Sequence, residues 1–350
     1  MATVLSTARR LGGYRYTQAE IEPWLSRWLE GNGEARERAI RMCRNSQVGA
    51  RASVVPIEEV FRERTFEEKN DIYRENAIIL AEDAARRALE EAGAAPEEVD
   101  IIISVSCTGF MIPAVDAYLI NRLGLRPEVK RLPMTEMGCA AGATALARAW
   151  EYLRAFPEHK ALVVSVELAT LTFQPRDFSM DNLVSAAIFG DGAAAAVLGG
   201  APGPGARIEG CRTTTLPGTL HLFGFRLSNT GFRIILSRGI PAAVRARLRP
   251  IVEGFLGEHG LALPEVRHLI FHPGGKRIIE VYRDELGLPE EALRFSAAML
   301  SAHGNLSSSS VLVILDDILR RGEAAPGDAG LLLAMGPGFT IEQLLLRWHG

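Results

Sequence analysis

The first half of the chain alternates between stretches in which apolar residues recur every three to four positions and short runs that are almost entirely apolar. The first pattern predicts amphipathic helices with one buried face, and the second predicts buried strands. The predicted helices cover residues 17–29, 33–45, 71–91, 115–123 and 139–156, and the predicted strands cover 99–106, 161–166 and 188–198. Such an alternation is typical of α/β proteins.

The second half repeats this alternation after a glycine- and proline-rich segment at 199–205, which predicts a linker. The predicted helices here cover 241–259, 275–286 and 306–321, and the predicted strands cover 266–272 and 331–335. Two α/β halves, residues 1–205 and 206–350, therefore predict a layered α/β fold made by internal duplication. The duplication rests on the pattern of elements, because the two halves share no residue-level repeat.

Composition narrows the class of protein. The 350 residues include 39 basic and 42 acidic side chains, for a formal net charge of -3, so no overall positive field indicates a nucleic-acid partner. Four widely spaced cysteines and seven histidines without a Cys/His cluster predict no structural metal and a reducing compartment. The chain shows no apolar signal core and no apolar run of membrane-spanning length. We therefore expect a cytoplasmic protein without integral membrane contact.

One cysteine stands where a nucleophile would be expected. Residues 135–144 read Thr-Glu-Met-Gly-Cys-Ala-Ala-Gly-Ala-Thr, which puts Cys139 on the first turn of an alanine-rich helix. The unpaired N–H groups and partial positive charge of a helix N-terminus stabilise a thiolate and lower its pKa. The small residues after Cys139 would leave space for an acyl group. The alternative is a buried cysteine that packs as a small hydrophobe.

Two polar residues of the second half are candidate partners for this thiol. His272 ends an apolar strand and is followed by Pro-Gly-Gly, so its ring can project from the strand's carboxyl end, where open α/β folds place their ligands. Asn305 lies just before an apolar helix. Taken singly, a histidine at the end of a strand is more often structural, and an asparagine before a helix is usually explained as an N-cap.

The predicted helix at 33–45 carries a basic face in an otherwise balanced protein. Its arginines are Arg36, Arg38, Arg41 and Arg44. The face is either solvated or a binding site for a phosphorylated ligand.

The order of these motifs resembles that of a known family. Cys139 lies in Gly-Cys-Ala-Ala-Gly, His272 in His-Pro-Gly-Gly and Asn305 in Gly-Asn-Leu-Ser-Ser, and residues 335–340 read Met-Gly-Pro-Gly-Phe-Thr. Pro113 and Asp116 and the sequence Phe-Gly-Asp-Gly-Ala at 189–193 match as well. From about Arg38 to Glu342 the chain resembles the bacterial type III polyketide synthases, members of the chalcone and stilbene synthase family with a thiolase-like fold.

The resemblance implies a role for several residues. Cys139, His272 and Asn305 would form the catalytic triad, and Phe189 and Phe232 would be gatekeepers between a coenzyme A tunnel and an inner cavity. Arg38 and Arg41 would meet coenzyme A phosphates, although Asn45 stands where plant members carry a further lysine. Ile112 would lie in a loop that reaches into the neighbouring subunit of a homodimer. The cavity would be lined by Cys107, Thr108, Phe110, Thr172, Phe223 and Phe225.

The implied reaction is loading of an acyl-CoA starter onto Cys139, decarboxylation of malonyl-CoA and repeated Claisen condensation, with no cofactor or metal beyond these substrates. The mixed lining, with little carboxylate or amide functionality, favours a medium- or long-chain starter that yields alkylpyrones or alkylresorcinols. A synthase of the tetrahydroxynaphthalene type, which uses malonyl-CoA alone, is the closest alternative. A single-condensation ketoacyl-carrier-protein synthase fits the ending at 335–340 less well, and a non-catalytic acyl-CoA-binding protein fits the intact triad less well.

Overall fold

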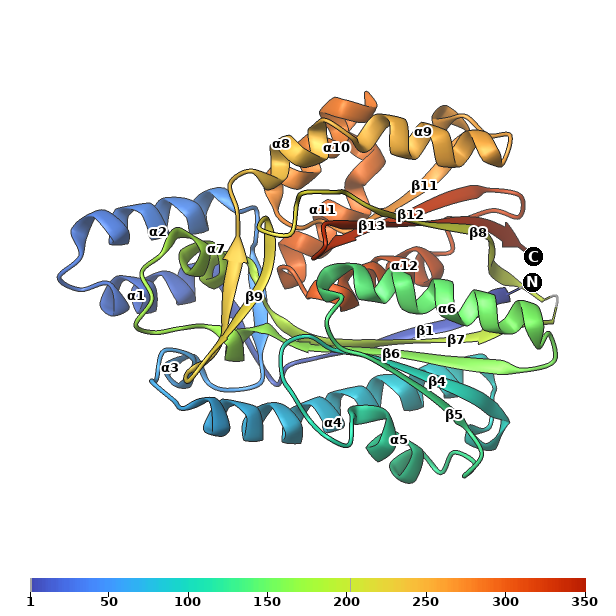
Figure 1. Cartoon of the computed structure of the whole chain (residues 1–350), viewed down its shortest axis with the longest axis horizontal. Coiled ribbons are helices and arrows are strands. Elements are labelled where there is room, and N and C mark those ends of the chain that lie inside the picture. The colour runs from blue at the N-terminus through green and yellow to red at the C-terminus, as the bar shows by residue number, and fades with distance from the viewer. Residues whose placement is uncertain (1, 202) are drawn as a thin grey trace.

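The computed structural model describes residues 2–201 and 203–350. Its centre is a nine-stranded mixed sheet in the order β11-β12-β13-β8-β1-β7-β6-β4-β5 (Figure 1). These strands are β1 (Ala2–Leu11), β4 (Val99–Val105), β5 (Lys130–Met134), β6 (Lys160–Leu168), β7 (Asp191–Gly199), β8 (Gly205–Thr215), β11 (Val266–Phe271), β12 (Ala329–Gly336) and β13 (Thr340–His349). Two smaller ribbons pair β2 (Tyr14–Thr17) with β3 (Ala50–Ser53) and β9 (Phe223–Ser228) with β10 (Gly231–Leu236).

Helices lie between the two halves of this sheet and on both of its outer faces, and a further group lies at one end of the molecule. The helices are α1 (Gln18–Trp28), α2 (Gly33–Asn45), α3 (Ile57–Val60), α4 (Phe66–Ala92), α5 (Val115–Leu123), α6 (Ala141–Ala155), α7 (Met180–Ile188), α8 (Ile240–Arg245), α9 (Leu248–Glu258), α10 (Lys276–Leu286), α11 (Arg294–His303) and α12 (Ser310–Arg321). Helices α6 and α12 lie in a central layer and share one apolar core with strands of both halves (Figure 1). Helix α4 covers one outer face and α9 and α10 cover the other.

The two halves of the sheet repeat one strand order, which confirms the predicted duplicated α/β fold. The N-terminal half contributes β4-β6-β7-β1 and the C-terminal half contributes β11-β12-β13-β8, with β1 and β8 adjacent. In both halves the first two of these strands are parallel and the remaining neighbours are antiparallel. The first strand of each half, β4 or β11, is thus parallel to its neighbour, and His272 follows directly after β11.

Several predicted boundaries need correction. The single helix expected at 241–259 is two helices, α8 and α9, because the chain leaves helical geometry at Arg247. Pro250 then lies in the first turn of α9, where its missing N–H is tolerated. The helix expected from 306 begins at Ser310, after a short 3-10 turn at Ser307–Ser309. The predicted linker lies between β7 and β8, and its residue 202 is outside the described residues.

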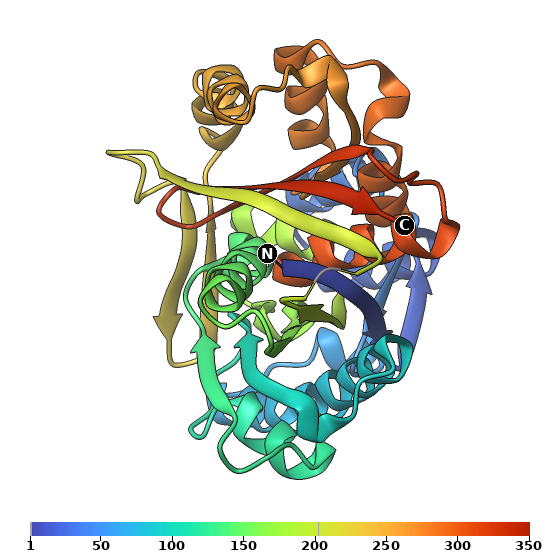
Figure 2. The same cartoon turned by 90° about the vertical axis from the view of Figure 1, so that its right-hand side faces the viewer.

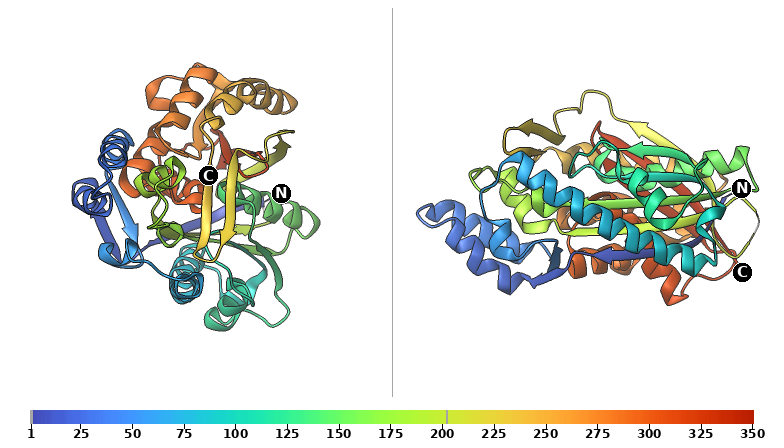
Figure 3. Two further views of the ribbon diagram at one scale, coloured as in Figure 1. Left: turned by 60° about the vertical axis from the view of Figure 1, so that its left-hand side comes forward. Right: turned by 90° about the horizontal axis from the view of Figure 1, so that it is seen from below.

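The end of the molecule opposite the two termini is formed by α1, α2 and α7 (Figures 1 and 2). Ribbon β9–β10 stands apart from the large sheet and lies against α4 and α7 (Figure 3). This end therefore brings together segments from both halves. Among the described helices, none is both long and apolar enough to cross a membrane.

Candidate active site

Cys139 lies in a 3-10 turn, Gly138–Ala140, that leads directly into α6. Gly138 has a φ of 52°, and a Cβ there would approach Pro337 Cδ to 2.6 Å, so this position requires glycine. A Cβ on Gly142 would overlap the carbonyl oxygen of Ser308. The two glycines thus let the cysteine turn pack tightly against the C-terminal half, and they leave Cys139 only 3% exposed.

His272 follows the last residue of β11 and is 2% exposed. Its backbone is fixed on both sides, because its N–H donates to the Leu333 carbonyl at 2.8 Å and the Tyr282 hydroxyl donates to its carbonyl at 3.0 Å. Within the described part of the chain, its Nδ1 has no hydrogen-bond partner. Burial lowers the pKa of His272 to about 4, so the resting imidazole is neutral.

Asn305 is also 2% exposed, and its side chain has a fixed orientation. Its Oδ1 accepts the Ser307 N–H at 2.7 Å, and its Nδ2 donates to the Gly274 carbonyl at 3.1 Å. Its backbone N–H donates to the Ile188 carbonyl at 2.7 Å. Since an amide nitrogen has two N–H groups, one of them is used by Gly274 and the other can serve a ligand.

Two cavities meet at Cys139. The larger one, about 770 Å³, has Cys139, His272 and Asn305 in its wall and is also lined by exposed residues such as Arg41. The smaller one, about 350 Å³, lies on the other side of the sulfur. Cys139, Phe189 and Phe223 line both. The structure thus brings the three predicted triad residues together and puts the sulfur between an outer tunnel and an inner cavity.

The two predicted gatekeepers occupy different positions. Phe189 lines both the tunnel and the inner cavity. Phe232 lines the inner cavity, where its ring centroid is 5.5 Å from that of Phe66 and 5.6 Å from that of Phe225. Phe223 is the second aromatic residue of the shared wall, a position that the sequence analysis did not assign to it.

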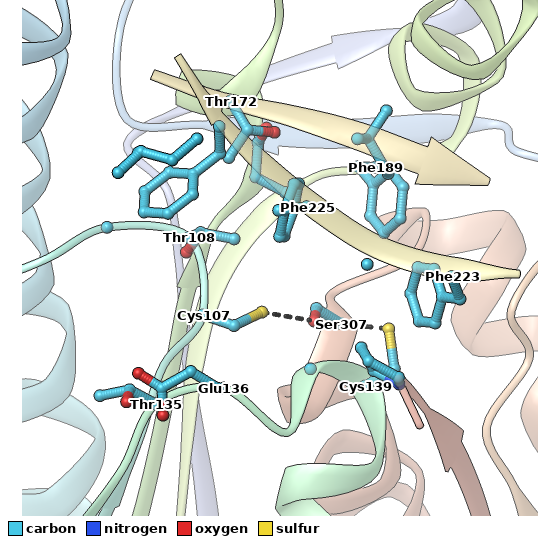
Figure 4. A pocket seen from close by; sticks show the side chains of 18 of the residues that line it. Cys107, Thr108, Thr135, Glu136, Cys139, Thr172, Phe189, Phe223, Phe225 and Ser307 are labelled. Atoms are coloured by element: carbon cyan, nitrogen blue, oxygen red, sulfur yellow. Dashed lines mark hydrogen bonds between the residues drawn. The ribbon is translucent and has the colours of Figure 1, made fainter. Parts of the chain in front are cut away.

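The residues predicted to line the cavity all border the inner cavity, and Figure 4 labels each of them except Phe110. Thr108 Oγ1 donates to Glu167 at 2.9 Å and accepts the Leu168 N–H at 2.8 Å. Thr172 Oγ1 donates to the Ala169 carbonyl at 2.8 Å. Since both of these hydroxyl hydrogens are already engaged, methyl groups and phenylalanine rings make up most of the wall, and Glu136 is the carboxylate among the lining residues.

A buried carboxylate lies behind this wall. Glu167 has no exposed surface and accepts hydrogen bonds from the Cys107 N–H at 3.0 Å, from Ser307 Oγ at 3.3 Å and from Ser308 Oγ. Burial raises the pKa of Glu167, and the hydrogen bonds from Ser308, Cys107 and Thr108 oppose that shift. Ser307 Oγ is 3.5 Å from Cys139 Sγ and 3.6 Å from Cys107 Sγ (Figure 4). One hydroxyl therefore connects both cysteines to the carboxylate.

Neither Glu167 nor Ser307 was identified from the sequence. A glutamate inside a mostly apolar strand was an available signal for Glu167, because such a residue is costly to bury without partners. The run of four serines after Leu306 was a signal for Ser307, because so many hydroxyl groups directly before an apolar helix indicate a hydrogen-bonding role.

The protonation of Cys139 differs from the expectation. Burial raises the pKa of the Cys139 thiol to about 12, although its contact with Ser307 acts in the other direction. A helix N-terminus favours a thiolate by only about 0.3–1 kcal/mol, whereas removing a lone charge from water costs several kcal/mol. The predicted lowering of the Cys139 pKa was therefore wrong, and the pair in this structure is a thiol and a neutral imidazole.

The residues expected at the coenzyme A entrance and at the subunit boundary do not all line a cavity of this chain. Arg41 and Asn45 line the tunnel, but Arg38 is ion-paired with Glu34 and is not among the tunnel residues. Ile112 is 83% exposed and lies outside both cavities of its own chain.

Two family models together match almost the whole chain. Residues 18–202 match the family model of the chalcone and stilbene synthases, N-terminal domain, and residues 207–349 match that of their C-terminal domain. The chain belongs to the chalcone and stilbene synthase family. Within it, the chain is a type III polyketide synthase.

Individual relatives cover almost the whole chain. It is 38% identical to the 1,3,6,8-tetrahydroxynaphthalene synthase of Streptomyces peucetius subsp. caesius, over 99% of this chain and 93% of the relative. It is 31% identical to an α-pyrone synthesis polyketide synthase-like protein of Mycobacterium tuberculosis, over 89% and 82%. The crystal structure of the tetrahydroxynaphthalene synthase from Streptomyces coelicolor A3(2) superposes with a TM-score of 0.96 at 34% identity, covering 99% of both chains.

Proposed function

We propose that this synthase transfers an acyl group from a coenzyme A thioester to Cys139 and extends it by decarboxylative condensation with malonyl-CoA. The observation that carries the proposal is the position of the Cys139 sulfur, which borders both an outer tunnel containing His272 and Asn305 and an inner cavity. A thioester entering by the tunnel would meet the sulfur first, and the growing chain would have the inner cavity beyond it.

Loading begins with a proton transfer. The Cys139 thiol gives its proton to the imidazole of His272, and the thiolate attacks the thioester carbonyl. The carbon–sulfur bond to coenzyme A breaks, and the departing thiolate takes the proton back from His272. Neither charge is favourable alone in this buried site, but the two form together and attract each other strongly at low dielectric.

Extension uses the two donors near the sulfur. His272 and the free N–H of Asn305 donate to the thioester carbonyl oxygen of malonyl-CoA, where negative charge develops as carbon dioxide leaves. The resulting enolate attacks the acyl carbonyl on Cys139 and forms a carbon–carbon bond, and the Cys139 thiolate departs. The lengthened chain, now a coenzyme A thioester, can load Cys139 again. Asn305 suits this step because it has no acidic proton with which to quench the enolate.

The inner cavity favours an apolar starter of medium length. Its wall contains Phe110, Phe189, Phe223, Phe225 and Phe232, and its threonine hydroxyl hydrogens are already engaged. A water molecule occupies about 30 Å³ in the liquid, so a cavity of about 350 Å³ has room for roughly a dozen chain atoms. Because the growing polyketide shares this space, medium-chain starters should be preferred to long ones, with alkylpyrones or alkylresorcinols as products.

A second candidate is a malonyl-only synthase. It is favoured by the similarity to the tetrahydroxynaphthalene synthases of Streptomyces, in both sequence and structure. A small cavity is also compatible with a chain built from malonyl units alone.

We further propose that the enzyme acts as a homodimer. An isoleucine as exposed as Ile112, with the neighbouring Phe110 also exposed, suits a contact with a second copy in which Ile112 would complete the cavity wall of the partner.

Mass spectrometry of products from a series of acyl-CoA starters, each with malonyl-CoA, tests these proposals together. We expect triketide and tetraketide products whose yield is greatest with medium-chain starters. Products from malonyl-CoA alone, unchanged by added starter, would favour the malonyl-only candidate. A single condensation, or binding without release of carbon dioxide, would contradict the proposed iterative synthase.

A further inference from the structure

The tunnel is also lined by cations outside α2, on elements of the C-terminal half. Arg238, in the loop after β10, and Lys276 and Arg277, which begin α10, line the same tunnel as Arg41. Arg41, Arg238 and Arg277 are exposed and make no ion pair within the described part of the chain.

The acidic residues of the tunnel do not neutralise these arginines. Asp181 accepts the Leu236 N–H at 2.9 Å, and Glu280 lies 3.8 Å from Lys276. Lys276 is therefore compensated on its own helix, whereas Arg238 and Arg277 are not. Since the chain as a whole has a net charge of -3, this uncompensated cluster is a local feature and not part of a general basic surface.

The start of α10 is electrostatically unusual. Its first turn holds Lys276 and Arg277 and no acidic residue, and the N-cap Gly275 provides no side-chain acceptor. A helix N-terminus normally attracts acidic side chains, because its free N–H groups carry partial positive charge. Lys276 and Arg277 are therefore repelled by the partial positive charge of the helix N-terminus, and an anion bound beside them would offset this repulsion.

Helix α2 alone provides little for a ligand with several phosphates. In the second half of α2, Arg38 is ion-paired with Glu34 and Arg44 with Glu22, so neither is free to bind a phosphate. Asn45 lines the tunnel but is neutral. Only Arg41 remains as a tunnel-lining cation on that side. A coenzyme A molecule carries a diphosphate and a separate ribose phosphate, so further cations are needed to meet it.

We propose that Arg238 and Arg277 form a second phosphate-binding rim, which with Arg41 holds the phosphorylated nucleotide end of coenzyme A thioesters. The proposal rests on the proposed function, since it names the ligand contacts of the same tunnel. The rim has a rigid base, because α8, which follows Arg238, packs against α10 through the apolar core that includes Ile240 and Val281. Guanidinium groups suit this role because they can bind phosphate oxygens with two N–H groups at once.

The test is the double variant Arg238→Gln/Arg277→Gln, compared on substrates with and without phosphates. We expect KM for malonyl-CoA to rise about tenfold or more while kcat changes little, because the contact is the same throughout the reaction. The kcat/KM for the malonyl thioester of N-acetylcysteamine, which lacks every phosphate, should not change. The Arg238→Lys/Arg277→Lys variant should recover part of the loss. Dephospho-coenzyme A thioesters show whether the rim holds the ribose phosphate or the diphosphate.

Arg249→Gln is a matched control, since Arg249 is on α9, is paired with Glu253 and lies outside the tunnel. It should leave the constants for both substrates unchanged. An unaltered KM for malonyl-CoA in the double variant, or an equal loss on the phosphate-free thioester, would overturn the proposed rim.

Calorimetric titration with free coenzyme A separates this proposal from the proposed function. Weaker binding of coenzyme A by the double variant, together with unchanged binding of pantetheine, would support the rim even if no condensation occurred. Equal affinity of the wild type and the variant for coenzyme A would refute it, whether or not the enzyme condenses malonyl units.

Discussion

Replacement of Asn305 by Ala should separate decarboxylation from loading. The amide is held by the Ser307 N–H at 2.7 Å and the Gly274 carbonyl at 3.1 Å, so its remaining N–H has a fixed direction. Loss of one such donor to a developing oxyanion lowers a rate by about 10²–10³-fold. We therefore expect the release of carbon dioxide from malonyl-CoA to fall by that factor, while transfer of a starter to Cys139 continues.

The same variant has a structural cost that must be measured separately. Asn305→Ala leaves the buried Ser307 N–H without its side-chain acceptor, which lowers the free energy of unfolding by about 1–3 kcal/mol. Asn305→Asp keeps an acceptor for this N–H but replaces the donating nitrogen by oxygen. If loss of the donor is the cause, both variants decarboxylate slowly, and the Asp variant keeps the Ser307 contact.

The assay is carbon dioxide release from malonyl-CoA, with loading measured by intact-protein mass and folding measured by thermal unfolding. A folded Asn305→Ala enzyme that decarboxylates at the wild-type rate would remove Asn305 from the mechanism. Equal loss of loading and decarboxylation would instead indicate a collapsed site.

Three further perturbations follow from the structure. The pKa of His272 is lowered from its ordinary value to about 4, so between about pH 6.5 and pH 4 the unfolded chain binds a proton that the folded chain does not, and stability falls as the pH decreases. In His272→Gln, the free energy of unfolding measured by chemical denaturation should depend less on pH in that range. An unchanged pH dependence would contradict the buried neutral imidazole. Phe225→Ala enlarges the inner cavity and should shift the preferred starter to longer chains, because each added buried methylene contributes about 0.8 kcal/mol, or roughly fourfold in affinity. An unchanged starter profile would show that Phe225 does not limit chain length. Gly142→Ala forces a methyl group against the Ser308 carbonyl and should lower the free energy of unfolding by about 1–3 kcal/mol, measured by thermal unfolding. Gly203→Ala is the neutral control, because a Cβ at Gly203 has open space around it.

The sequence predicted the triad because each member lies at the boundary of an element. Cys139 starts a helix, His272 ends a strand, and Asn305 precedes a helix, so local pattern and glycine punctuation were sufficient to locate them. Their meeting follows from the duplicated fold, in which α6 and α12 share one core.

Contacts between distant segments were not predictable in this way. Glu167 and Ser307 are 140 positions apart, and their connection exists only because β6 packs against the turn at Ser307–Ser309. The arginines at positions 238 and 277 likewise lie on different elements and share only the tunnel. Strands β1 and β13 were missed because buried polar residues such as Thr7 and Glu342 interrupt them, so neither forms the continuous apolar run that indicates a buried strand.

Thr108 is a poor position for testing starter length by filling the cavity. Plugging the cavity at Thr108 with Phe would also remove the hydroxyl that connects Glu167 and the Leu168 N–H. Phe225, whose side chain lines the cavity without a hydrogen-bonding role, is therefore the better position for testing starter length.

The central claim is that the acyl group is carried on Cys139. The direct measurement is intact-protein and peptide mass spectrometry after incubation with an acyl-CoA starter and no malonyl-CoA. We expect one acyl adduct, located on the peptide that contains Cys139 and absent from Cys139→Ala, with Cys107 unmodified. An adduct on Cys107, or acylation that persists in Cys139→Ala, would contradict the assignment of the nucleophile.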